Sequence, residues 1–242
     1  MKLENLTCKN WSKLLTRPTK TVEDIEGTVT KIFNEVSLKG DVAIQKYTLF
    51  FDGVTVSETL VSQAEIDNAI SKVPDELKNA IQVAKHNIEL FHKAQKTRKV
   101  RIETTKGVVC WQEKRAIEQV GLYIPGGTAP LFSTVLMLAI PAEISGCKEV
   151  VLCSPPDKSG VINPAILYAA NLCGVTKIYK VGGIQAIAGM TFGTESIPQV
   201  FKIFGPGNQF VTVAKQLATK YGVAIDMPAG PSELLIVADD TA

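Results

Sequence analysis

Three glycine-rich runs hold the residues of this sequence whose types and spacing could do chemistry: GLYIPGG at 121–127, KVGGIQA at 180–186 and IFGPGNQ at 203–209. Each run follows an apolar stretch typical of a strand and precedes a helical pattern. Each also carries a larger polar residue beside its glycines, namely Tyr123, Gln185 and Asn208. Glycine lets the backbone approach a ligand, and the free N–H groups at a helix start bind anions. The pattern therefore predicts a site for a phosphate-bearing ligand.

No short fingerprint narrows the ligand further. The chain contains neither G-x-G-x-x-G nor G-x-x-x-x-G-K-[ST], so neither the usual dinucleotide loop nor a P-loop identifies a nucleotide. Ordinary turn chemistry explains any one of the three runs taken alone. Their recurrence at three strand ends favours binding, and we expect the three polar side chains to lie in exposed loops.

Histidine and cysteine offer little alternative chemistry. His86 and His92 share one predicted helix and lie about 240° apart around its axis, so they cannot chelate one metal together. The five cysteines include no C-x-x-C pair, which argues against a disulfide framework and a structural zinc site. Cys153 could act as the nucleophile of an aldehyde-dehydrogenase-like enzyme, but no histidine in the second half of the chain could activate it.

The elements that must position the glycine runs follow from hydrophobic periodicity. From Val108 onward, short apolar strands alternate with helices, which predicts a parallel, doubly wound α/β sheet with helices on both faces. The first hundred residues predict helices, one beginning at Thr21 and ending at Gly40, one over 43–49 and a longer one from Asp75. Ligands bind such sheets at the carboxyl ends of the strands, where the three runs fall.

Composition limits the possible partners. The 242 residues are 45% hydrophobic with a net charge of +2, so no strong field draws the chain to nucleic acid or anionic lipid. The one basic run, 93–101, is typical of a solvated helix end. No window is apolar enough for a membrane span, and the first residues lack the apolar core of a signal peptide. We expect a cytoplasmic protein that binds no nucleic acid and no membrane.

Three long runs then resemble one known family: VGLYIPGGTAPLFSTVLMLAIPA, VGGIQAIAGMTFGTESIPQVFKIFGPGN and IDMPAGPSELLIVAD. From about Gly107 to Ala242 the chain is similar to histidinol dehydrogenase. The resemblance implies an NAD-dependent, zinc-containing homodimer with variant Rossmann-like domains. It also implies oxidation of L-histidinol through histidinaldehyde to L-histidine, the last step of histidine biosynthesis.

The resemblance also assigns residues and domains. It places NAD contacts on Tyr123, Gln185 and Asn208, and a histidinol contact on Ser232. The family's zinc ligands and its Glu–His pair for proton transfer are expected downstream of Ala242, so no catalytic or metal residue is assigned and we expect the chain alone to be inactive. The expected domains are a helical region with part of a first Rossmann-like domain (1–117), a Rossmann-like NAD-binding domain (118–224) and a strand returning to the first domain (225–242).

Two alternatives stay open from the sequence. The first is a non-catalytic nucleotide-binding or scaffolding module, which the same motifs would serve. The second is the enzyme with a Cys153 nucleophile, which requires an activated thiol in a crevice.

Overall fold

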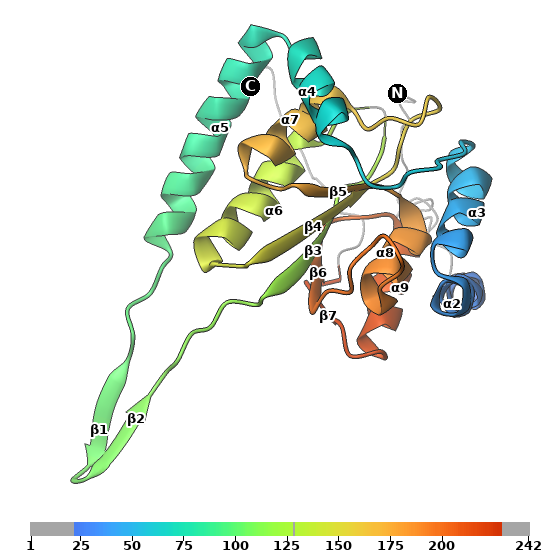
Figure 1. Cartoon of the computed structure of the whole chain (residues 1–242). Coiled ribbons are helices and arrows are strands. Elements are labelled where there is room, and N and C mark those ends of the chain that lie inside the picture. Colours follow the sequence, from blue (N-terminus) through green and yellow to red (C-terminus); the bar gives the residue numbers. More distant parts are fainter. Residues whose placement is uncertain (1–21, 128, 229–242) are drawn as a thin grey trace, which may run out of the picture.

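A five-stranded parallel sheet forms the centre of the molecule (Figure 1). The computed structural model describes residues 22–127 and 129–228. The strands lie in the order β5-β4-β3-β6-β7. Their bounds are β3 Gln119–Tyr123, β4 Glu149–Ser154, β5 Lys177–Lys180, β6 Lys202–Phe204 and β7 Ala224–Ile225. The parallel pairing of all five confirms the predicted α/β class.

Helical crossovers connect these strands in chain order. The helices are α6 Phe132–Ser145, α7 Pro164–Leu172, α8 Gly183–Phe192 and α9 Gln209–Thr219. The chain winds from β3 outward to β4 and β5, and then crosses back to β6 on the other side of β3. The winding therefore changes direction between β3 and β6. In an open parallel sheet this switch point opens a crevice at the carboxyl ends of the strands.

Two apolar cores cover the two faces of the sheet. Alternate residues of β4 show the division, because Val151 and Cys153 point into one core and Leu152 into the other. The first core packs against α2 Val22–Lys39, α3 Asp41–Asp52, α8 and α9. The second packs against α6, α7, α4 Gln63–Lys72 and α5 Asp75–Ala94. Helices thus lie on both sides of the sheet, as predicted from the near-continuous apolar strands (Figure 1).

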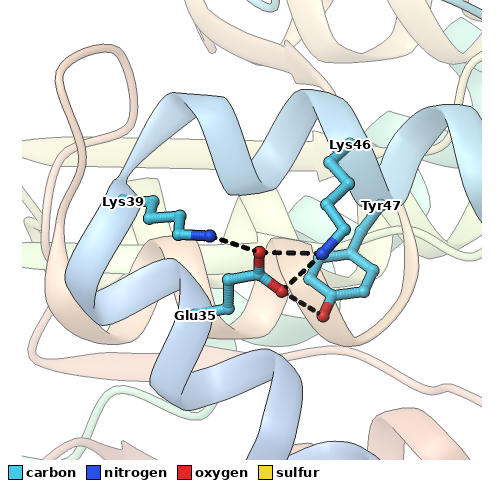
Figure 2. Close-up of polar contacts among 4 residues, drawn as sticks. All are labelled: Glu35, Lys39, Lys46 and Tyr47. Atoms are coloured by element: carbon cyan, nitrogen blue, oxygen red, sulfur yellow. Dashed lines mark hydrogen bonds and ion pairs between the residues drawn. The ribbon is translucent and has the colours of Figure 1, made fainter.

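A polar cluster on Glu35 ties α2 to α3 (Figure 2). The Glu35 carboxylate accepts hydrogen bonds from Lys46 at 2.7 Å, from the Tyr47 hydroxyl at 2.6 Å and from Lys39 at 3.0 Å. These contacts, with Lys46 contributing most, lower the pKa of Glu35 to about 2. The bend between the two helices is made by Gly40, whose φ of 51° is unfavourable for other residues. The cluster fixes the direction in which α3 leaves this bend.

The N-terminal helices follow the sequence prediction with one omission. Helices were predicted up to Gly40, over 43–49 and from Asp75, and α2, α3 and α5 confirm them. The predicted cap Thr21 lies outside the described residues. Helix α4 was not predicted; it is ten residues long and buries only Ile66 and Ala69. None of the helices in the described ranges is long and apolar enough to cross a membrane.

An antiparallel hairpin corrects the prediction that the parallel pattern begins at Val108. The run VVCW is a strand, β2 Val108–Trp111, but it pairs with β1 Arg101–Thr105 in a separate two-stranded ribbon that extends from the body (Figure 1). The turn between the strands contains Gly107 at φ 85°. So short a connection permits only antiparallel pairing. The basic run predicted as a helix end is also divided, since α5 ends at Ala94 and β1 begins at Arg101.

Strand β7 crosses the predicted domain boundary at 224/225. Ile225 is in register with Ile203 of β6, so this residue still belongs to the five-stranded sheet. Most of the segment predicted to return to a first domain, 229–242, lies outside the described residues. The division into three domains therefore stays a prediction.

Candidate active site

A cavity of about 800 Å³ opens at the carboxyl ends of the central strands. Its wall comes from the end of α3, the loops after β3 and β4, and the first residues of α7, α8 and α9. This volume lies within the range of small-molecule sites, about 300–1,000 Å³. The location is the one predicted for a ligand crevice, beside the switch point between β3 and β6.

Several glycines of the predicted runs are required by loop packing. A Cβ on Gly126 would meet the ring of Pro155 at 2.6 Å, and a Cβ on Gly182 would meet the same ring at 2.5 Å. A Cβ on Gly205 would collide with the backbone of Tyr123, and the φ of Gly205 is 133°. The glycines therefore bring the loops after β3, β4, β5 and β6 into direct contact, which shapes the floor of the cavity.

Tyr123 lies in this floor with its side chain buried. Its hydroxyl oxygen accepts a hydrogen bond from the backbone N–H of Gly183 at 3.0 Å. Burial, and to a lesser degree the nearby charge of Asp52, raise the pKa of Tyr123 to about 12. The phenol is therefore protonated at neutral pH. No acceptor for this proton is recorded within 22–127 and 129–228, so the O–H group can donate to a ligand.

Asn208 reaches the same cavity from the start of α9. Its side-chain oxygen caps the helix by accepting a hydrogen bond from the backbone N–H of Val211 at 3.1 Å. The cap leaves the side-chain NH₂ group of Asn208 for other partners. The structure thus brings Tyr123 and Asn208 to one cavity, and Asn208 is exposed as expected.

Gln185 differs from its prediction. It was expected in an exposed loop, but it lies inside α8 with 0% of its surface exposed and does not line the cavity. Both polar atoms of its amide are without a partner among the described residues. The amide oxygen lies behind the Gly183 turn, 3.0 Å from the position that a Gly183 Cβ would take. A buried amide without hydrogen-bond partners costs about 1–3 kcal/mol of stability. An unsatisfied group of this kind is typical of a site that binds a ligand or a water molecule.

The first turns of α7, α8 and α9 lie at the cavity, since Asn163, Gly183 and Asn208 all line it. A helix start carries a partial positive charge and binds anions. No lysine or arginine occurs among the described lining residues. An anionic ligand here would therefore be held by helix starts and backbone groups rather than by ion pairs.

Two candidate site residues, Asp52 and Lys215, were not predicted from the sequence. Asp52, at the end of α3, lines the cavity, and burial raises its pKa to about 6. Lys215 is buried in α9 and donates to the Gly205 carbonyl at 2.7 Å and to the Asp226 carboxylate. Nothing in the run around Asp52 indicates a site. Lys215, however, interrupts the apolar stripe formed by Val211 and Ala218, a signal of a buried cation with a partner.

The cysteine alternative finds no support in the site. Cys153 is fully buried, and burial raises the pKa of its thiol well above the usual range. A thiol without thiolate character is a poor nucleophile. The observation argues against the enzyme with a Cys153 nucleophile.

The described residues do not form a zinc site. No group of three or more His, Cys, Asp or Glu side chains within 22–127 and 129–228 could hold a metal ion. His86 and His92 lie on α5, and His92 hydrogen-bonds Gln95 at 2.8 Å. Ser232, the predicted histidinol contact, lies outside the described residues.

Comparison with known proteins gives one consistent family. A family model described as histidinol dehydrogenase matches residues 15–242. The chain is 58% identical over 232 residues to histidinol dehydrogenase of Bacteroides fragilis, covering 96% of this chain and 54% of the relative. It is 54% identical over 239 residues to that of Escherichia coli K12, covering 98% of this chain and 54% of the relative.

A solved structure gives the same result. The crystal structure of histidinol dehydrogenase from Elizabethkingia anophelis matches with a TM-score of 0.89 and 57% identity, over 98% of this chain and 55% of that one. The chain thus spans about half the length of the relatives it matches.

Proposed function

This chain belongs to the histidinol dehydrogenase family, and we propose that it supplies the NAD platform of an enzyme that oxidises L-histidinol to L-histidine through histidinaldehyde. The observation that carries the proposal is the cavity at the switch point, where Tyr123, Asn208 and three helix starts meet. The dinucleotide, when bound, supplies the acceptor for hydride. Its phosphates suit the helix starts, since these bind anions without needing a basic side chain.

The residues of the chain have separate roles in this proposal. The protonated Tyr123 hydroxyl and the Asn208 NH₂ group donate hydrogen bonds to the cofactor. Gln185 is proposed as the third contact on the motif; its two amide atoms have no partner among the described residues, although it does not line the cavity. Lys215 and Asp226 position the Gly205 loop by hydrogen bonds to the carbonyl and the N–H of Gly205. Ser232 is proposed as a histidinol contact on the motif alone.

Proton transfer and metal binding need groups that these residues do not offer. Oxidation of an alcohol requires a base near neutral pKa, usually histidine, and the only two histidines of the sequence are His86 and His92 on α5. We therefore propose that the base and the zinc ligands are not among these 242 residues. The homodimer and the cytoplasmic location likewise rest on the family.

A second candidate function is a nucleotide-binding module without catalysis. The same cavity would bind the nucleotide. Both histidines lie on α5 and neither lines the cavity, which favours a non-catalytic role for this chain alone. The length of the reading frame and turnover by its product distinguish the two.

Calorimetric titration of NAD tests the proposed site. The Asn208→Asp and Asn208→Ser variants both keep an oxygen that caps α9 and both lose the NH₂ donor. We expect NAD affinity to fall about tenfold or more, with a small change in stability. Unchanged NAD affinity in both variants would remove Asn208 from the site. NAD binding that cannot be detected in the complete product of the reading frame would overturn the proposed function.

A further inference from the structure

Two carboxylates are found among the described residues that line the cavity, and they differ in their partners. Asp157 is satisfied within its own loop, since one of its oxygens accepts from the backbone N–H of Ser159 at 2.8 Å, the Ser159 hydroxyl at 2.6 Å and the backbone N–H of Val161 at 3.2 Å. Asp52 receives no recorded hydrogen bond, and its Oδ2 is sealed from solvent without a partner. Asp52 therefore has no partner for its carboxylate among the described residues, whereas Asp157 has one oxygen held by its own loop.

The position of Asp52 is fixed by the fold. It is the last residue of α3, which ends at Gly53 with φ 71°. The helix is anchored by the buried side chains of Ala43, Ile44 and Tyr47 and by the hydrogen bond from Tyr47 to Glu35. The anchored first half of α3 and the turn at Gly53 set the place of Asp52 at the cavity wall.

A hydrogen-bond donor without an acceptor lines the same cavity as Asp52. The Tyr123 O–H proton has no acceptor among the described residues, and the charge of Asp52 acts on the Tyr123 phenol. Both side chains line the same cavity. The wall of this cavity thus offers one donor and one anionic acceptor.

This pair discriminates between classes of ligand groups. A phosphate would accept from Tyr123 but would be repelled by the Asp52 carboxylate, and an ammonium would pair with Asp52 but leave Tyr123 unsatisfied. A hydroxyl group satisfies both, because it accepts from the phenol and donates to the carboxylate. Hydroxyl-bearing sugars are held by acidic side chains in other dinucleotide sites.

We propose that Asp52, together with Tyr123, binds a ribose hydroxyl of the dinucleotide in this cavity. The proposal rests on the proposed function, in which NAD is the ligand. It adds a cofactor contact from the N-terminal helical region to the contacts from the sheet. A hydroxyl could also come from the alcohol of histidinol, so the test measures both ligands.

The experiment titrates NAD and, separately, histidinol into the complete product of the reading frame by calorimetry. The variants are Asp52→Asn and Asp52→Ser, with Asp157→Asn as the control that removes the same charge from the same cavity. Loss of a hydrogen bond to a charged acceptor predicts NAD affinity about ten- to hundredfold weaker in both Asp52 variants. Removing a charge near an anionic cofactor should by itself strengthen binding, so the predicted sign cannot come from electrostatics alone.

Each outcome has a meaning. Weaker NAD binding in the Asp52 variants, with Asp157→Asn close to wild type and histidinol unaffected, supports the proposal. Unchanged NAD binding in the Asp52 variants, equal losses in all three variants, or a loss confined to histidinol would each overturn it. If the Asn208 variants lose NAD while the Asp52 variants do not, only this inference fails and the proposed function stands.

Discussion

Asp52 is expected to make stability depend on pH. Burial raises its pKa from 3.8 to about 6, so the folded chain binds this proton more tightly than the unfolded chain does. The resulting penalty appears as pH rises from 3.8 through about 6 and is complete above it. Asp52→Asn should therefore raise Tm near pH 7.5 by more than it does near pH 4. The charge of Asp52 acts on the phenol of Tyr123, whose pKa is raised to about 12, so Tyr123 stays neutral throughout this range.

Thermal unfolding of both proteins across pH 4 to 8 measures this difference. Asp157→Asn serves as the control, since that carboxylate is hydrogen-bonded in its loop and should not gain stability on losing its charge. A Tm difference between wild type and Asp52→Asn that does not change with pH would show that burial of the charge is not the cause.

Replacing the Gln185 amide is expected to change stability and NAD affinity in opposite directions. Its two amide atoms are buried without partners, so replacing them with apolar groups of similar size removes a penalty of about 1–3 kcal/mol. We expect Gln185→Leu to raise the free energy of unfolding and to weaken NAD binding. Gln185→Ala should not stabilise, since it leaves a cavity in α8. Denaturant unfolding with calorimetry measures both effects, and a destabilised Gln185→Leu protein would mean that the amide has a partner in solution.

Single residues of the site were predictable where they follow a strand. Tyr123 and Asn208 were predicted to share a site because larger polar residues recur beside glycines at neighbouring strand ends, and both line the cavity. The burial of Gln185 was missed, because the sequence pattern does not reveal that residues 184–191 of α8 are all buried. Asp52 was missed because its role depends on where α3 ends in space, which only the packing of α3 against the sheet decides.

At the scale of elements, the ion pair between α9 and the end of β7 positions the Gly205 loop. Lys215 donates to the Gly205 carbonyl and to Asp226, which in turn accepts from the Gly205 N–H at 2.8 Å. Lys215→Met should leave Asp226 without its cation and destabilise the fold by about 2–3 kcal/mol, less than for a fully buried pair because the Asp226 side chain keeps 29% exposure. NAD affinity should fall as well, since Asn208 is carried by the same loop.

Lys220→Met is the matched control, because Lys220 lies just after the same helix and pairs with Glu26 at the surface. Exposed pairs contribute about 0–1 kcal/mol. Denaturant unfolding compares the two variants. Equal effects would indicate that Lys215 contributes no more than a surface charge.

How well each helix or strand could be predicted depends on the strength of its apolar pattern. The runs that became β3 to β6 and α6 to α9 carry strong apolar patterns, since they bury apolar side chains in the two cores, and they were predicted in order. The exposed hairpin β1–β2 has no buried face, so its pairing could not be predicted from alternation. Which strand neighbours which follows from tertiary packing, although the right-handed crossover rule allows few choices.

At the scale of the whole molecule, the chain should bind the cofactor without turning over. Its two histidines lie on α5, on the opposite face of the sheet from α8 and α9. A verified preparation of these 242 residues should show no histidinol-dependent NADH formation and no stoichiometric zinc. The complete product of the reading frame should show both. Absorbance of NADH and metal analysis measure them, and turnover by the 242-residue preparation would mean that the base lies within this chain.

The central claim is that the cavity at the ends of β3 and β6 is the dinucleotide site. A crystal structure with NAD bound tests it most directly. We expect density between Tyr123 and Asn208, with the phosphates at the starts of α8 or α9 and a ribose hydroxyl at Asp52. Density for NAD at any other surface, with this cavity empty at saturating NAD, would contradict it.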